Sequence, residues 1–125
     1  MYPRLIVDLD KVFCNVKQMV DLCRTFGISV CGVTKAVCGD PHIVKVFVDG
    51  GVASLGDSRL DHILRYKDIE LPKVLIRAPQ IQDAAGIVEN VDVSVNTEIE
   101  AMEALEDACS RLGVRRHGVM LMVDL

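Results

Sequence analysis

The chain has 125 residues, of which 50% are hydrophobic and 4% aromatic, and its formal net charge is −4. This length and composition are enough for one modest hydrophobic core. An acidic chain with few aromatic side chains is a poor ligand for nucleic acid and for anionic membrane surfaces, so we expect neither as a partner.

Apolar runs alternate with helical patterns along the whole chain. In the first half, the runs cover residues 5–7, 29–35 and 52–55. Asp10 is expected to cap a helix that ends at Gly27. One apolar stripe of this helix should be buried, formed by Val12, Val16, Met19, Val20 and Cys23. The next helix should begin with Asp40 as N-cap and Pro41 at N1, because these residue types are preferred there.

The second half of the chain continues the pattern. Its apolar runs cover residues 73–77, 92–96 and 118–124. Ser58 is expected to cap a short helix, and a weaker helix is expected over residues 83–89. Thr97 and Glu100 have the spacing of a capping box for a last helix that ends at Gly113.

Apolar runs that are each followed by an amphipathic helix predict β-α units and a parallel sheet. The runs are nearly continuous in apolar residues, as expected for strands buried on both faces. Nothing follows the last run to cover it, because the sequence stops at Leu125. We therefore expect a piece of a longer protein; the alternative is an open sheet whose end is buried in an oligomer.

Lys35 is the leading candidate for a catalytic residue. It ends the second apolar run and directly precedes the loop of residues 36–41. The carboxyl ends of buried parallel strands are where α/β folds place their chemistry. An amine that is desolvated there can bond to an aldehyde cofactor. The alternative is a solvated lysine at a strand end.

Two further residues at strand ends are weaker candidates. Arg77 would point into the mouth of the sheet, where a guanidinium can bind a substrate carboxylate, although a salt bridge to a loop acid would also explain it. Asn96 could hydrogen-bond near a cofactor, but asparagine is also a common turn residue. Ser58 fits a helix cap better than a ligand.

Cysteine and histidine spacing predicts no metal site. The five cysteines, at positions 14, 23, 31, 38 and 109, are odd in number and contain no C-x-x-C pair. They fit reduced thiols in a cytoplasmic protein. His42, His62 and His117 have no partners at metal-ligand spacing. No secretory signal or membrane-spanning run is visible in the sequence.

Three groups of residues carry a resemblance to a known family. The first is Tyr2-Pro3-Arg4-Leu5 with Val7-Asp8-Leu9-Asp10 and Asn15, and the second is Gly32-Val33-Thr34-Lys35 with Cys38-Gly39-Asp40-Pro41. The third is Gly56-Asp57-Ser58-Arg59, Val95-Asn96-Thr97-Glu98 and Met122-Val123-Asp124-Leu125. Together they resemble the alanine racemase family of pyridoxal-phosphate enzymes, known as fold type III, and within it the ornithine racemase-like branch.

The resemblance implies a (β/α)₈ barrel with a β-rich second domain. Residues 1–125 would form the N-terminal part of the barrel, truncated after about five barrel strands, with the strand at residues 5–7 belonging to the otherwise absent second domain. Lys35 would bind pyridoxal 5'-phosphate covalently and move a proton at the substrate. The second proton donor of the family is a tyrosine from a partner subunit, which neither Tyr2 nor Tyr66 can replace.

The resemblance also has departures that bear on the substrate. Alanine racemases have a tyrosine at the position of Gly39 and a lysine at that of Met122. Both differences fit the ornithine-like branch. We therefore expect a racemase of ornithine or a similar basic amino acid that forms homo-oligomers, with this segment alone inactive. The alternatives are a non-catalytic protein of pyridoxal-phosphate homeostasis, and a structural fragment that pairs with its own copy through open sheet edges.

Overall fold

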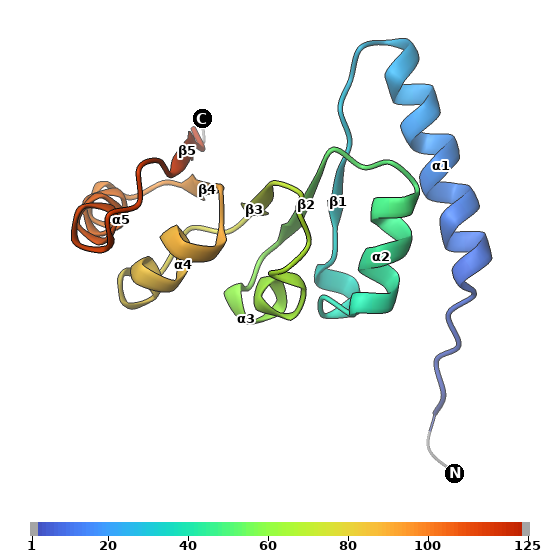
Figure 1. The fold of residues 1–125 in the computed structure, drawn as a ribbon, viewed down its shortest axis with the longest axis horizontal. Coiled ribbons are helices and arrows are strands. Elements are labelled where there is room, and N and C mark those ends of the chain that lie inside the picture. The colour runs from blue at the N-terminus through green and yellow to red at the C-terminus, as the bar shows by residue number, and fades with distance from the viewer. Residues whose placement is uncertain (1–2, 124–125) are drawn as a thin grey trace.

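The computed structural model describes residues 3–123 as a parallel sheet flanked by helices (Figure 1). The strands are β1 (Cys31–Val33), β2 (Ser54–Asp57), β3 (Lys73–Leu75), β4 (Val93–Asn96) and β5 (Gly118–Leu121). The α-helices are α1 (Leu9–Thr25), α2 (Pro41–Asp49), α3 (Leu60–Ile63), α4 (Ala84–Asn90) and α5 (Ile99–Leu112). Short 3₁₀ helices are η1 (Lys35–Val37), η2 (Leu64–Tyr66) and η3 (Ile81–Asp83).

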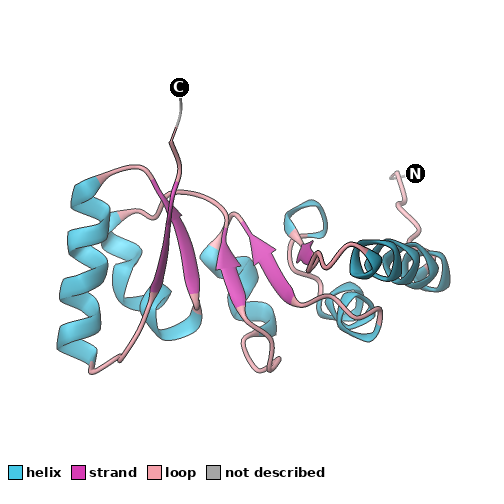
Figure 2. Cartoon of the chain, turned by 90° about the horizontal axis from the view of Figure 1, so that it is seen from above, coloured by secondary structure: helices cyan, strands magenta, loops and turns pink. Residues whose placement is uncertain are grey.

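The strands pair in chain order, β1-β2-β3-β4-β5, and every pair is parallel. Figure 2 shows the strands side by side with their arrows pointing the same way. A doubly wound sheet would reverse its strand order at some point, whereas a (β/α)₈ barrel adds each new strand beside the last. The predicted α/β class and the partial barrel are therefore confirmed.

One face of the sheet carries the hydrophobic core. Gly32, Leu55 and Lys73 share a register across β1, β2 and β3, and a Cβ added at Gly32 would lie 2.8 Å from a ring carbon of Phe47 in α2. This row therefore faces the helices, and Leu55 is fully buried in it. Burying a leucine side chain stabilises a fold by roughly 1.5–3 kcal/mol. The core cluster includes Val44, Ile63, Leu75, Ile87 and Leu105.

The opposite face of the sheet is open among the described residues. Side chains alternate along a strand, so the neighbours of the core row point to this second face. Over β1 and β2 these residues are Cys31, Val33, Ser54 and Gly56, with the Cys31 Sγ lying 3.1 Å from where a Cβ of Gly56 would be. Over β5 the face carries Met120, which is 56% exposed.

Several predicted helix ends are confirmed. Asp40 is the N-cap of α2, with its Oδ1 accepting from the backbone N–H of His42 at 2.9 Å, and Pro41 is its first residue. Gly27 follows the end of α1 with φ +70, and Gly113 follows α5 with φ +69. Both glycines adopt the left-handed conformation that ends helices without a Cβ penalty.

Other caps were predicted wrongly. The N-cap of α1 is Asp8 rather than Asp10, and its Oδ1 accepts from the Lys11 N–H at 3.1 Å. Ser58 caps nothing; Arg59 is the N-cap of α3 and makes no side-chain cap bond. The capping box of Thr97 and Glu100 is also absent, because α5 begins after Glu98 without a side-chain cap. The start of α1 is thus set by a local cap two residues before the predicted one, whereas α3 and α5 begin without any side-chain cap bond.

The N-terminal strand predicted over residues 5–7 is wrong for the described part of the chain. No strand is formed there, and Leu5 is 88% and Ile6 80% exposed. A strand needs a hydrogen-bonded neighbour, and the described residues supply none beside this segment. Asp124 and Leu125, like Tyr2, lie outside the described residues, so the last predicted strand is tested only up to Val123.

Strand boundaries and the α1 stripe differ in detail from the prediction. The third predicted run, residues 52–55, forms a strand two residues later, and the runs at 29–35 and 73–77 are each only partly strand. In α1, Val20 is buried but Met19 is 56% exposed. Within residues 3–123, no helix combines the length and apolar character that a bilayer crossing demands.

Candidate active site

The carboxyl ends of the parallel strands meet at one rim of the sheet, and Lys35 lies there. It follows the end of β1 by two residues and starts η1. Lys35 is exposed among the described residues, so the desolvation that would free its amine is not seen there and stays a prediction. Its place at the strand end agrees with the prediction.

The loop after Lys35 is closed by its own backbone. The Thr34 carbonyl accepts from the N–H of Val37 at 3.0 Å and from that of Gly39 at 3.2 Å. The Cys38 N–H donates to the Lys35 carbonyl at 3.3 Å. Cys38 and Gly39 both have positive φ, at 53 and 64. The lysine is thus presented by a tight turn whose backbone groups are paired.

Gly39 also fixes this turn against α3. A Cβ added at Gly39 would lie only 2.6 Å from the His62 carbonyl oxygen, closer than real Cβ atoms approach. The Arg65 Nη1 donates to the Cys38 carbonyl at 3.0 Å and holds the turn from the same side. A larger side chain at position 39 is excluded unless the backbone of His62 moves.

A buried polar cluster lies directly behind Lys35, and it consists of Thr34, Asp57, His62 and Tyr66. The Asp57 carboxylate and the Thr34 side chain are fully buried. Asp57 Oδ2 accepts from Thr34 Oγ1 at 2.6 Å, and Asp57 Oδ1 accepts from His62 Nδ1 at 3.0 Å. Asp57 Oδ1 also accepts from the Arg59 N–H at 3.1 Å. Sequence reasoning placed Thr34 and Asp57 in family motifs and weighed His62 and Tyr66 for other roles, but it did not predict that the four form one cluster.

Proton positions in this cluster follow from the acceptor. A carboxylate only accepts, so the Thr34 hydroxyl donates to Asp57. The Tyr66 hydroxyl, 3.2 Å from Thr34 Oγ1, must then donate to that oxygen. Burial raises the pKa of Tyr66 above its usual range, which keeps the phenol protonated as a donor. The three side chains form one directed chain from Tyr66 through Thr34 to Asp57.

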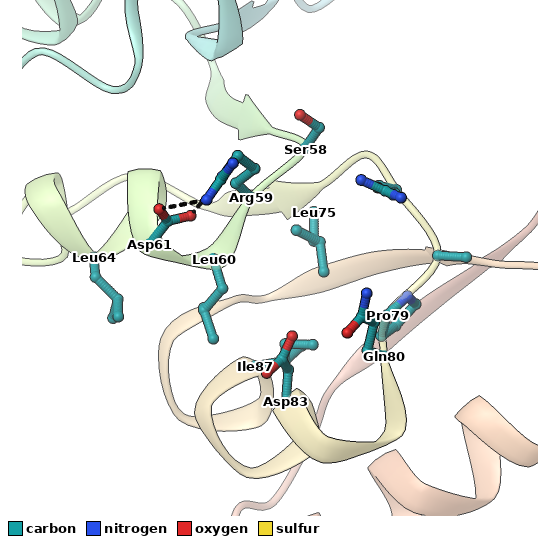
Figure 3. A pocket seen from close by; sticks show the side chains of 12 residues that line it. Ser58, Arg59, Leu60, Asp61, Leu64, Leu75, Pro79, Gln80, Asp83 and Ile87 are labelled. Carbon is teal, nitrogen blue, oxygen red and sulfur yellow. Dashed lines mark hydrogen bonds and ion pairs between the residues drawn. The ribbon is translucent and has the colours of Figure 1, made fainter.

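Arg77 lies in a cavity of about 440 Å³ at the ends of β2 and β3. Figure 3 shows this cavity, with Leu60 from α3 and Ile87 from α4 on its walls. The neighbouring Arg59 is engaged by Asp61, with Nε 2.9 Å from Oδ1, whereas Arg77 forms no ion pair within residues 3–123. Lys35 does not line this cavity, so the structure does not bring Lys35 and Arg77 into one pocket.

Asn96 is fully buried at the end of β4 rather than open at the rim. Its Nδ2 donates to the Ser94 carbonyl at 2.8 Å and to Ser94 Oγ at 2.9 Å, while its Oδ1 has no partner. Ser94 Oγ lies 2.8 Å from His117 Nε2, and His117 Nδ1 lies 3.0 Å from the Val91 carbonyl. The structure thus groups Asn96 with His117, and its contact with a cofactor stays a prediction.

The contacts of His117 fit its neutral form. A carbonyl only accepts, so Nδ1–H donates to Val91, and in the neutral ring the remaining Nε2 accepts from the Ser94 hydroxyl. Burial lowers the pKa of His117, against smaller opposing effects of the Val91 carbonyl and of Asp92. Among the described residues, no group of three or more histidine, cysteine or acidic side chains could hold a metal ion.

The sequence is similar to two characterised racemases over its whole length. It is 32% identical to the ornithine racemase of Acetoanaerobium sticklandii and 30% identical to the lysine racemase of Thermotoga maritima, covering 100% of this chain in both cases. It spans 35% and 36% of those proteins, or about a third of their length. No family model matches the chain.

Solved structures share the fold. The D-threonine aldolase of Filomicrobium marinum superposes with a TM-score of 0.85 over 99% of this chain and 35% of that one, at 15% identity. The alanine racemase of Clostridium difficile 630, in complex with cycloserine, gives a TM-score of 0.75 over 97% of this chain and 35% of that one, at 17% identity.

The full-length sequence similarity and the shared arrangement of parallel strands agree with each other and with the residues around Lys35. In sequence the chain is thus similar to ornithine and lysine racemases, and in fold it resembles an N-terminal segment of the alanine racemase family.

Proposed function

We propose that this chain supplies the cofactor-binding lysine of a pyridoxal-phosphate-dependent amino-acid racemase, and that Lys35 is this lysine. The observation that carries the proposal is the position of Lys35 at the carboxyl end of β1, in a chain 32% identical throughout to an ornithine racemase. The whole activity needs residues that the described segment does not contain, so the segment alone is expected to be inactive.

The residues present fit the cofactor that the family uses. Lys35 is an exposed residue, so an aldehyde can reach it, and the turn of residues 34–39 presents it from the strand end. Bound pyridoxal phosphate supplies an electron sink for the pair left behind when the substrate loses its α-proton. Lys35 would bond to the cofactor aldehyde and, once released by the substrate amine, would hold or return that proton on one face.

Inversion at the α-carbon requires a second proton donor on the opposite face. Tyr66 is the one tyrosine among residues 3–123, and its hydroxyl donates to the buried Thr34. It therefore cannot serve as that donor. This is the physical reason to expect negligible racemase activity from the chain by itself.

Ornithine or a similar basic amino acid is the proposed substrate. The relatives named for ornithine and lysine support this, since those substrates share an ammonium on an unbranched side chain. The Gly39 turn also supports it, because a tyrosine like that of alanine racemases has no room beside His62. We further propose a cytoplasmic location, which the five free cysteines favour.

Absorbance with added pyridoxal phosphate tests the role of Lys35. The wild-type chain should develop a visible band, because a protonated carbon–nitrogen double bond to the cofactor ring absorbs there. Lys35→Ala should lack the band, while Lys45→Ala should keep it, since Lys45 is an exposed lysine paired with Asp49 at 3.0 Å. An equal band in Lys35→Ala would refute the assignment, and interconversion of D- and L-ornithine by this chain alone would refute the expected inactivity.

A further inference from the structure

We propose that Asp57 is a positioning residue for Lys35: its buried carboxylate anchors the Thr34 hydroxyl and so fixes the peptide that carries the lysine. The inference rests on the proposed function, because it concerns how Lys35 is presented to an aldehyde. Asp57 ends β2, whereas Lys35 follows β1, so the anchor ties the lysine to the neighbouring strand.

The burial of Asp57 is the first reason. Its side chain is 0% exposed, and its ion-pair neighbour is a histidine rather than a lysine or arginine. A buried carboxylate is costly unless several donors surround it. Here the donors are the Thr34 hydroxyl, His62 Nδ1 and the Arg59 N–H. A hydrophobic side chain of similar volume would fill the same space at a lower free-energy cost. The carboxylate at this position therefore indicates a role other than stability.

The position of Thr34 is the second reason. Every polar group of Thr34 is engaged, although the residue is covalently adjacent to the exposed Lys35. Its N–H donates to the Gly56 carbonyl at 2.8 Å, its carbonyl accepts from Val37 and Gly39, and its hydroxyl donates to Asp57. Two of these partners, Gly56 and Asp57, belong to β2. The lysine therefore starts from a residue whose place β2 determines.

The link from Asp57 through His62 to Gly39 is the third reason. Asp57 holds His62 through Nδ1, and the His62 carbonyl is the atom against which Gly39 packs. The Asp57 carboxylate thus bonds directly to Thr34 at one end of the turn, and it is linked to Gly39 at the other end through His62. Loss of the carboxylate should loosen the turn at both ends and let Lys35 occupy several positions.

The readout is the preference of pyridoxal phosphate for Lys35 over a surface lysine in the same molecule. The folded chain is incubated with pyridoxal phosphate and borohydride reduces the carbon–nitrogen double bond to a stable secondary amine. Peptide mass spectrometry then gives the ratio of modified Lys35 to modified Lys45. Lys45 has a side chain that is 72% exposed and serves as an internal reference.

The variants separate positioning from simple loss of stability. Thr34→Val keeps the shape but removes the hydroxyl, and Asp57→Asn keeps the shape but removes the charge. Both should lower the ratio by about tenfold or more, since misplacement by about an ångström has effects of this size. Thr34→Ser restores the hydroxyl and should restore the ratio. Asp61→Asn changes an exposed carboxylate on α3, the helix that carries His62, and should leave the ratio unchanged.

Each outcome decides the matter. If wild type shows no preference for Lys35, the proposed function fails and this inference fails with it. If wild type prefers Lys35 and Thr34→Val keeps the same ratio, the proposed function stands and the inference alone is overturned. Circular dichroism monitors the fold. A variant that partly unfolds, yet keeps the wild-type ratio in the folded molecules, would show that the cluster is merely structural and would also overturn the inference.

Discussion

Replacing Gly39 by alanine should destabilise the fold more than the same change at other left-handed glycines. Gly39 has φ +64, and an added Cβ would lie 2.6 Å from the His62 carbonyl oxygen. The left-handed conformation costs an alanine about 1–2 kcal/mol. Forcing a methyl group into occupied space costs about 1–3 kcal/mol more. The free energy of unfolding should therefore fall by about 2–5 kcal/mol.

Two matched variants isolate the contact with His62. Gly27 and Gly113 have φ of +70 and +69, and an added Cβ at either would meet nothing within 4 Å. Gly27→Ala and Gly113→Ala should therefore lose only the backbone term, about 1–2 kcal/mol. Urea unfolding followed by circular dichroism measures all three variants. A cost for Gly39→Ala no greater than that for the two controls would refute the rigid packing of the lysine turn against α3.

Two further predictions concern pH and assembly. Burial lowers the pKa of His117 below its ordinary 6.5, so the unfolded chain binds the proton more readily than the folded one. The free energy of unfolding should not change above neutral pH, and it should fall as the pH drops through about 6.5 towards the pKa of the folded state. The measurement compares urea midpoints at pH 7.5 and 5.5. His117→Gln should show a smaller difference between these two midpoints than the wild-type chain. The outer edges of β1 and β5 are unpaired among the described residues and favour self-association. Sedimentation at micromolar concentration should therefore detect a homodimer or a larger species. A monodisperse monomer would contradict this prediction.

Elements with strong local signals were predictable from the sequence. The parallel strands followed from apolar runs, and the start of α2 followed from Asp40 and Pro41 because the cap bonds link neighbouring residues. Residues 5–7 have the same apolar character as the true strands but form none, since pairing depends on a neighbour that local sequence does not specify. Thr97 and Glu100 likewise have the right spacing, yet α5 starts without their side chains.

Within the candidate site, the sequence predicts single residues at strand ends but not the contacts between residues far apart in the chain. Lys35 was identified because its place at a strand end is itself the signal. The cluster behind it joins Thr34 to Asp57 and Tyr66, which are 23 and 32 residues away. No periodicity or motif links such positions, so only the fold brings them together. For Asn96, the predicted position at a strand end is correct. The burial of its side chain could not be predicted, because the sequence does not show which way the side chain points.

The open face of the sheet exposes apolar side chains on both of its outer strands. Val33 of β1 is 40% exposed and Met120 of β5 is 56% exposed. Apolar surface is stabilised when it is removed from water. A segment that covers this face would therefore have to present apolar side chains of its own, with a contour complementary to Val33 and Met120.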